Sequence, residues 1–223
     1  MADRWATFDC YGTLIDWDGG IRSTLSRLWP EADADELLER YHEIEPRVQL
    51  EGSLTYREVL TQALRLLADA EGLELRPDDE AALADSLPEW PPFPEVPGEL
   101  AELRRRGWRI GILSNTDPEL LDASLARIGV EFDARVTAAE AGSYKPAPGH
   151  WVSFRERFGA DPARHVHVAA SAFHDLGPAA ELGLPAVWIN RVGDTSDHPR
   201  EAELQSLIGL ADTLDRIRPP GSV

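Results

Sequence analysis

The sequence predicts a parallel α/β fold in which helices cover a sheet and a small helical domain interrupts the chain after the first strand. Three observations support this fold class. Short apolar runs alternate with amphipathic segments from Trp108 onward, as repeated βαβ units do. A stretch with purely helical spacing, from Ile21 to about Leu87, separates the first apolar run from the others. Polar residues follow the apolar runs, at the positions where parallel α/β folds bind their ligands.

The first apolar run, Trp5–Asp9, predicts a buried strand that ends before Gly12. Between Ile21 and Leu87, apolar side chains recur at i, i+3 and i+4 with charges between them, which predicts amphipathic helices. The proline-rich segment Pro88–Pro97 follows. Because proline fixes φ, this segment predicts a stiff connector that returns the chain to the sheet.

We therefore expect a core domain formed by residues 1–16 and 91–223, with a helical domain of residues 17–90 inserted into it. The second part of the core alternates strand and helix, which predicts a Rossmann-like parallel sheet. The expected strands span 108–113, 132–137, 165–169 and 185–190, and the expected helices span 118–128, 150–158 and 175–182.

Charge and composition narrow the classes of partner. The 223 residues include 22 Lys and Arg against 40 Asp and Glu, a net charge of −18, which repels phosphate backbones and anionic lipids. We expect neither a nucleic-acid nor a membrane partner, and no apolar run approaches the roughly 20 residues of a bilayer span. The N-terminus lacks a secretory pattern, and the single cysteine, Cys10, is typical of a reducing compartment. These features predict a cytoplasmic protein.

Four polar clusters follow four of the expected elements, and in a parallel sheet they converge on one edge. One cluster holds Lys145, the only lysine in a chain that uses arginine at every other basic position. A lysine ammonium is a compact point charge that arginine does not replace, so this position indicates a specific role. The clusters are Asp9–Thr13, Ser114–Thr116, Lys145–Pro146 and Ser171–Asp175.

These motifs resemble, in order and separation, the four motifs of the haloacid dehalogenase superfamily. The helical insertion resembles the cap domain of that superfamily, so the resemblance implies a HAD-like fold and covers the chain from Trp5 to about Leu214. Within the superfamily, the chain is most similar to the L-2-haloacid dehalogenase (type II) branch through Tyr11, the stretch Trp188–Arg191 and the position of the insertion. The four matching segments are Phe8–Leu14, Leu113–Asn115, Tyr144–Pro146 and Asp175.

The resemblance implies that Asp9 is a nucleophile that forms a covalent ester, which splits one displacement into two easier steps. Thr13 is expected to hydrogen-bond the Asp9 carboxylate and orient it. Lys145 is expected to keep Asp9 ionised, because a neighbouring opposite charge favours the charged form. Asp175 completes the implied catalytic set by holding Lys145 and positioning the hydrolytic water.

Further residues are implied to bind the substrate. Tyr11 replaces the acid that superfamily phosphatases use to protonate a leaving oxygen, and a phenol of pKa about 10 serves that purpose poorly. Ser114 and Asn115 correspond to donors for a substrate carboxylate and the departing halide. Arg40 is our candidate for the cap arginine of the dehalogenases, with Arg47 as a second candidate.

The last motif departs from the dehalogenase pattern. Ala170 and Ala172 stand where the dehalogenases carry polar side chains, and Trp151 stands where they carry a tyrosine in the site. Ser171 is retained as a substrate-binding candidate. His174 is either a base that compensates for the lost polar groups or a structural residue next to a helix start.

The resemblance implies no metal or other cofactor in the dehalogenase branch. With Ala170 and Tyr11 in place of two acids, only Asp9 and Asp175 remain as charged ligands for the Mg²⁺ that superfamily phosphatases use, and Mg²⁺ prefers an oxygen-rich octahedron. The histidines lack zinc spacing. We expect a metal-free site, with Mg²⁺ as the alternative.

Three functional hypotheses remain open at this stage. The first is a hydrolase that displaces halide from a short 2-haloacid through an ester on Asp9 and releases a 2-hydroxyacid. The second is a Mg²⁺-dependent phosphatase of a small metabolite, and the third is a relative that binds a small ligand without turnover. A small anionic substrate is expected in the first two. The resemblance also favours a homodimer.

Overall fold

The computed structural model describes residues 3–50 and 54–221 and contains one six-stranded sheet with the strand order β3-β2-β1-β4-β5-β6. Every neighbouring pair of strands is parallel, which confirms the predicted fold class. β1 is central and fully buried, so its carboxyl end opens at the middle of the sheet edge. The strands are β1 Arg4–Phe8, β2 Trp108–Ser114, β3 Ala134–Thr137, β4 His165–Ala169, β5 Ala186–Ile189 and β6 Ala202–Leu204.

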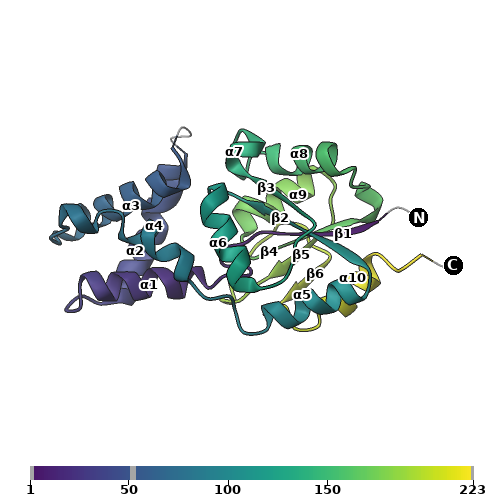
Figure 1. Cartoon of the computed structure of the whole chain (residues 1–223), viewed down its shortest axis with the longest axis horizontal. Coiled ribbons are helices and arrows are strands. Elements are labelled where there is room, and N and C mark those ends of the chain that lie inside the picture. Colours follow the sequence, from purple (N-terminus) through teal and green to yellow (C-terminus); the bar gives the residue numbers. More distant parts are fainter. Residues whose placement is uncertain (1–2, 51–53, 222–223) are drawn as a thin grey trace.

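Helices cover both faces of the sheet (Figure 1). Leucines of α5 and α10 pack into one apolar cluster, and Trp151 and Phe154 of α8 pack with Ala179 of α9 into a second. Nothing in the sequence analysis anticipated α5, α10 or β6. The helices of this part are α5 Val96–Arg105, α6 Pro118–Ile128, α7 Ala138–Ala141, α8 Gly149–Phe158, α9 Gly177–Glu181 and α10 Leu210–Ile217.

The predicted helix over 175–182 begins later than expected. Ser171 Oγ accepts a hydrogen bond from the backbone N–H of His174 at 3.1 Å, which caps a π-helical turn over Ala172–Leu176. Asp175 therefore lies in this turn, before α9 starts at Gly177. The turn follows β4 directly and brings the Asp175 side chain back to the sheet edge.

Four helices form a separate unit beside the sheet, which we call the helical unit (Figure 1). Asp33 caps α2, and Thr55 with Glu58 forms a capping box at the start of α3, so local sequence fixes both helix starts. Leucines at helical spacing on α3 pack the unit together. Within the described ranges, no helix has the length and apolar character needed to cross a bilayer. The unit comprises α1 Trp17–Leu28, α2 Ala34–Gln49, α3 Tyr56–Glu71 and α4 Ala82–Ser86.

Two chain segments join the helical unit to the sheet, and they lie side by side. The backbone N–H of Asp16 donates to Pro91 O at 2.9 Å, and that of Phe93 donates to Leu14 O at 3.0 Å. These contacts pair the exit from β1 with the proline-rich return segment. The division into residues 1–16, 17–90 and 91–223 stays a prediction, but the helices it assigned to the insertion are present.

Candidate active site

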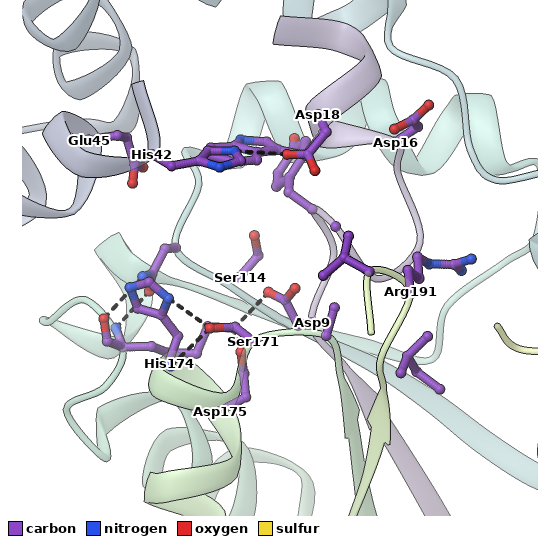
Figure 2. Close-up of a pocket in the computed structure, with 18 of the residues that line it drawn as sticks. Asp9, Asp16, Asp18, His42, Glu45, Ser114, Ser171, His174, Asp175 and Arg191 are labelled. Atoms are coloured by element: carbon purple, nitrogen blue, oxygen red, sulfur yellow. Dashed lines mark hydrogen bonds and ion pairs between the residues drawn. The ribbon is translucent and has the colours of Figure 1, made fainter. Parts of the chain in front are cut away.

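A cavity of about 570 Å³ lies between the carboxyl edge of the sheet and the helical unit. Figure 2 shows Asp9, Ser171, His174 and Asp175 on the sheet side and Glu45 with His42 and Asp18 on the opposite side. Gly12, with φ of 81°, provides the left-handed turn that ends the first motif, a conformation that residues with a Cβ rarely adopt.

Lys145 is the centre of the polar site. Its Nζ donates to Asp9 Oδ1 at 2.7 Å, to Asp175 Oδ1 at 2.8 Å and to the carbonyl oxygen of Leu113 at 3.0 Å. These bonds use all three ammonium hydrogens, and the Lys145 side chain is only 1% exposed. The only lysine of the chain therefore holds two carboxylates from different strands in one fixed arrangement.

The pKa values of the two carboxyl groups, Asp9 and Asp175, are shifted in opposite directions. Burial raises the pKa of Asp9, and the charge of Asp175 adds to this shift, while Lys145 and Thr13 counteract it. Burial also opposes ionisation of Asp175, but Lys145 and a hydrogen bond from His167 outweigh it and hold its pKa well below the usual range. Lys145 loses some basicity through burial and regains more from Asp175 and Asp9, so its pKa is raised. Asp175 therefore stays ionised, and Asp9 has the higher pKa of the two carboxyl groups.

Thr13 orients Asp9 through a directional pair of bonds. The backbone N–H of Ala170 can only donate, and it donates to Thr13 Oγ1 at 2.9 Å. The Thr13 hydroxyl hydrogen is consequently free to donate to Asp9 Oδ2, also at 2.9 Å. Both oxygens of Asp9 are therefore held, one by Lys145 and one by Thr13.

A buried chain behind Asp175 was not anticipated as part of the site. His167 Nε2 lies 2.9 Å from Asp175 Oδ1, its Nδ1 lies 3.0 Å from Thr7 Oγ1, and that hydroxyl lies 2.7 Å from His165 Nε2. Burial, followed by the charge of His167, lowers the pKa of His165 to about 3, so this ring is neutral. The signal in the sequence was two histidines two residues apart on one strand, which alternation places on the same face.

The predicted substrate-binding residues Tyr11, Ser114, Asn115, Ser171 and His174 all line the cavity. The Tyr11 hydroxyl pairs with Ser124 Oγ of α6 at 2.9 Å, and burial raises its pKa, so it is a poor acid. Asn115 Oδ1 accepts from the backbone N–H of Lys145 at 2.7 Å. His174 Nδ1 lies 3.0 Å from Ser171 Oγ, and burial lowers the pKa of this histidine, which leaves it neutral at neutral pH.

The structure does not place Arg40 at the cavity. Its side chain is 58% exposed and pairs with Glu43 at 3.3 Å and Glu71 at 3.6 Å, and it does not line the cavity. The reason is helix phase, because α2 turns Tyr41 and Glu45 inward and leaves Arg40 on the outer face. The second candidate, Arg47, is also exposed.

The structure does not place Trp151 at the cavity either. Trp151 is 4% exposed and lies in the core behind the site, not in the cavity wall. Its ring packs edge to face on His167 with a centroid separation of 5.3 Å. Because α8 packs its inner face on the sheet, this position supports the buried histidine chain and cannot contact a ligand in the cavity.

The helical unit contributes cavity residues that the sequence analysis missed. Glu45 is 3% exposed, lines the cavity and accepts a hydrogen bond from Gln49. His42 stacks on Trp17 at 5.2 Å, and its Nε2 lies 3.0 Å from Asp18 Oδ1. The available signal for Glu45 was its place on the apolar face of an amphipathic helix, where an acid is seldom found without a partner or a function.

The donor set at the sheet edge does not fit a divalent cation. Lys145 already occupies the space between Asp9 and Asp175, and Ala170 and Tyr11 provide no carboxylate beside them. Over the ranges that the structure describes, no three His, Cys, Asp or Glu residues are grouped as metal ligands. Mg²⁺ needs several oxygen ligands in near-octahedral arrangement, so we derive no step through a metal.

A carboxylate nucleophile candidate, held by one buried lysine at the edge of a parallel sheet, defines a class of α/β enzymes that work through covalent esters. The family model described as haloacid dehalogenase-like hydrolase matches residues 4–183. The chain belongs to this family, which confirms the resemblance found in its motifs.

Comparison with known proteins agrees with this assignment. The chain is 29% identical over 204 residues to the (S)-2-haloacid dehalogenase of Pseudomonas sp. (strain YL), covering 84% of this chain and 82% of the relative. It is 27% identical over 221 residues to (S)-2-haloacid dehalogenase 4A of Burkholderia cepacia, covering 97% and 94%. The structure of L-2-haloacid dehalogenase from Xanthobacter autotrophicus superposes with a TM-score of 0.84 at 21% identity, over 96% of this chain and 99% of that one.

Proposed function

We propose that the protein hydrolyses the carbon–halogen bond of a short 2-haloacid through a covalent ester on Asp9. The observation that carries this proposal is the arrangement around that carboxylate. Both Asp9 oxygens are fixed by Lys145 and Thr13 at the floor of the cavity, while the neighbouring Tyr11 is too weak an acid to protonate an alkoxide leaving group. A halide leaves as a stable anion and needs no such proton.

In the first step, an Asp9 oxygen attacks C2 of the substrate from the side opposite the halogen. The new C–O bond forms as the carbon–halogen bond breaks, and the halide leaves with the bonding electron pair, which inverts the carbon. Ser114 and Asn115 lie at the end of β2, just before α6, and we assign the substrate carboxylate to donors there. The helical unit acts as the cap that closes over the substrate.

In the second step, water attacks the Asp9 carbonyl carbon of the ester and releases the 2-hydroxyacid with the Asp9 carboxylate restored. Neutral His174, which lines the cavity next to Ser171, accepts a proton from this water and returns it to the departing alkoxide oxygen, so the product leaves as the alcohol; the second water proton is released to solvent as Asp9 returns to the carboxylate. Asp175 holds Lys145 in place throughout, and Lys145 stabilises the charge that develops on the Asp9 oxygens.

Halide release from L-2-chloropropionate tests the proposal. We expect release by the wild-type protein that EDTA and added Mg²⁺ do not change, and none by Asp9→Asn. In ¹⁸O-water under single-turnover conditions, the label should enter the Asp9 carboxylate, and the first product should carry an unlabelled oxygen. Halide release by Asp9→Asn, or label appearing directly in the product, contradicts the ester. Phosphate-ester turnover that requires Mg²⁺, without halide release, supports the phosphatase alternative instead.

We further propose that this reaction takes place in the cytoplasm and in a homodimer. The single cysteine, Cys10, is free and buried and supports a reducing compartment. The dimer is supported by exposed apolar side chains on the helical unit, Leu50 and Leu66. Sedimentation equilibrium of the purified protein tests the dimer, and a single species of 24.7 kDa contradicts it.

A further inference from the structure

In-line displacement determines where the leaving group goes. The halide must depart on the side of C2 that faces away from the attacking Asp9 oxygen. The sheet lies behind Asp9, and the helical unit lies across the cavity from it (Figure 2). The departing halide therefore moves toward the wall that α2 contributes, where Glu45 and Gln49 lie.

No free cation is present on that wall among the described residues. Arg40 points to solvent, and each lysine and arginine that lines the cavity already has an anionic partner. Lys145 pairs with Asp9 and Asp175 on the sheet side. The two arginines of the cavity wall pair with acids as well, Arg22 with Asp35 at 2.5 Å and Arg191 with Glu95 at 2.8 Å.

A directional chain of hydrogen bonds orients Glu45. The backbone N–H of Lys145 must donate, and it donates to Asn115 Oδ1, so Asn115 Nδ2 is the atom that donates to Gln49 Oε1 at 3.2 Å. The remaining amide nitrogen, Gln49 Nε2, donates to Glu45 Oε1. The Tyr56 hydroxyl accepts from Trp17 Nε1 at 3.2 Å and also hydrogen-bonds Glu45. Glu45 is thus tied to the nucleophile's lysine through two amides.

The protonation of Glu45 is set by its surroundings. Burial raises its pKa to about 7, while the hydrogen bonds from Gln49 and Tyr56 and the charge of His42 restrain the shift. An anionic substrate or a departing halide favours the protonated form further, since a second negative charge nearby opposes ionisation. The titratable groups that interact with Glu45 are Tyr41 and His42 of its own helix, Tyr56 of α3 and Tyr144 of the loop before α8. Asp18 of α1 pairs with His42.

We propose that Glu45, with its carboxyl group protonated, donates the hydrogen bond that stabilises the departing halide, in the place where the resemblance implied an arginine. This inference rests on the proposed dehalogenation. The carboxyl hydrogen stays on Glu45 while the halide leaves with its electron pair, so no proton is consumed in the step. A neutral donor suits this wall, because the cavity already contains Asp9, Asp175 and an anionic substrate against one lysine.

The proposal gives two measurable consequences. Dehalogenation requires Glu45 in its acid form, so kcat should decline as the pH rises through the pKa of Glu45 in the substrate complex. Hydrogen bonds to halides strengthen from bromide to chloride to fluoride, so the loss of this donor should slow fluoride release more than bromide release. A purely structural Glu45 predicts neither effect.

The test compares Glu45→Gln, Glu45→Leu and the matched control Glu43→Gln, which removes a charge from the exposed face of the same helix. Gln keeps an N–H donor but cannot titrate, so Glu45→Gln should remain active and lose the alkaline decline of kcat. Glu45→Leu should lose about 10- to 100-fold in kcat at pH 6, the typical effect of removing a donor to a charged group. Glu43→Gln should keep both the wild-type rate and the wild-type pH profile.

The outcomes separate this inference from the proposed function. If the wild-type protein releases no halide from chloro-, bromo- or fluoroacetate, the dehalogenation itself is wrong. If it releases halide and Glu45→Gln keeps the alkaline decline, or Glu45→Leu slows all three substrates equally, the assignment of Glu45 is overturned while the reaction stands. Circular dichroism and urea unfolding of each variant identify a failure to fold. If Glu45→Leu does not fold, the pH profile of kcat in Glu45→Gln decides whether Glu45 has the proposed role.

Discussion

Replacing Lys145 with methionine removes three buried hydrogen bonds while keeping most of the volume of the methylene chain. Asp9, whose side chain is 12% exposed, then has no counter-charge, and Asp175, whose side chain is 0% exposed, keeps only its bond from His167. Breaking a buried pair in this way costs about 3–5 kcal/mol. That is a large part of the roughly 5–15 kcal/mol that stabilises a typical domain.

The pH dependence of this loss has a definite sign. In the wild-type protein the pKa of Asp175 lies below its unfolded value, so its contribution is present above the unfolded pKa and is lost as the pH falls through the folded pKa. Without Lys145, the burial that raises the pKa of Asp9 is no longer counteracted by the lysine, so the folded variant takes up a proton there and gains stability as the pH falls from 7 to 5. The difference in unfolding free energy between wild type and variant should therefore shrink toward pH 5.

Urea unfolding at pH 7 and pH 5, followed by tryptophan fluorescence, measures this difference. Arg57→Met is the matched control, since Arg57 pairs with Asp85 at 2.6 Å on the surface and its loss should cost under about 1 kcal/mol. A loss below about 1 kcal/mol in Lys145→Met, or a stability difference from the wild type that does not shrink between pH 7 and pH 5, would refute this account of the site.

Three further expectations concern activity. Thr13→Val removes the donor to Asp9 and leaves the N–H of Ala170 without its acceptor, so kcat should fall about 10- to 100-fold, and a loss below twofold in a halide assay would contradict the orienting role. Arg40→Ala should keep kcat/KM within about twofold, because the side chain lies on the outer surface; a tenfold loss would mean that Arg40 reaches the substrate. Activity should decline in acid at a pH above the ordinary aspartate range, since Asp9 must be ionised and burial raises its pKa, and a pH–rate profile that stays flat down to pH 4 would contradict this.

The grouping of Asp9, Lys145 and Asp175 could be predicted because it depends on topology. The three residues lie far apart in the sequence, but a sheet of parallel strands joined by helical crossovers has the carboxyl ends of all its strands at one edge. Motif order and the single lysine then sufficed to select these three residues. The exact hydrogen-bond partners were a matter of side-chain geometry, and the histidine chain behind Asp175 became visible only once β1 and β4 were paired.

The residues of the helical unit could not be predicted in the same way. Arg40 was predicted from its distance to Asp9 along the sequence. Because each successive residue of a helix is rotated by about 100°, an error of one residue is enough to turn a side chain from the cavity to the solvent. The neighbouring Tyr41 and Glu45 face inward instead. Trp151 does not line the cavity because α8 packs that residue on His167.

The outward position of Arg40 has a physical consequence for how the site binds negatively charged groups. Lys145 is balanced by Asp9 and Asp175, so the cavity has no net positive charge to attract an anionic substrate. Binding must then rely on donors without a full charge, which are the backbone N–H groups before α6 and the acid form of Glu45. Such donors also leave the Asp9 carboxylate less compensated than an arginine in the wall would, and a less compensated carboxylate is a stronger nucleophile. Because each arginine of the cavity wall in the described part of the chain is paired with an acid, binding of the substrate and the halide is weaker, and the Asp9 carboxylate is a more reactive nucleophile.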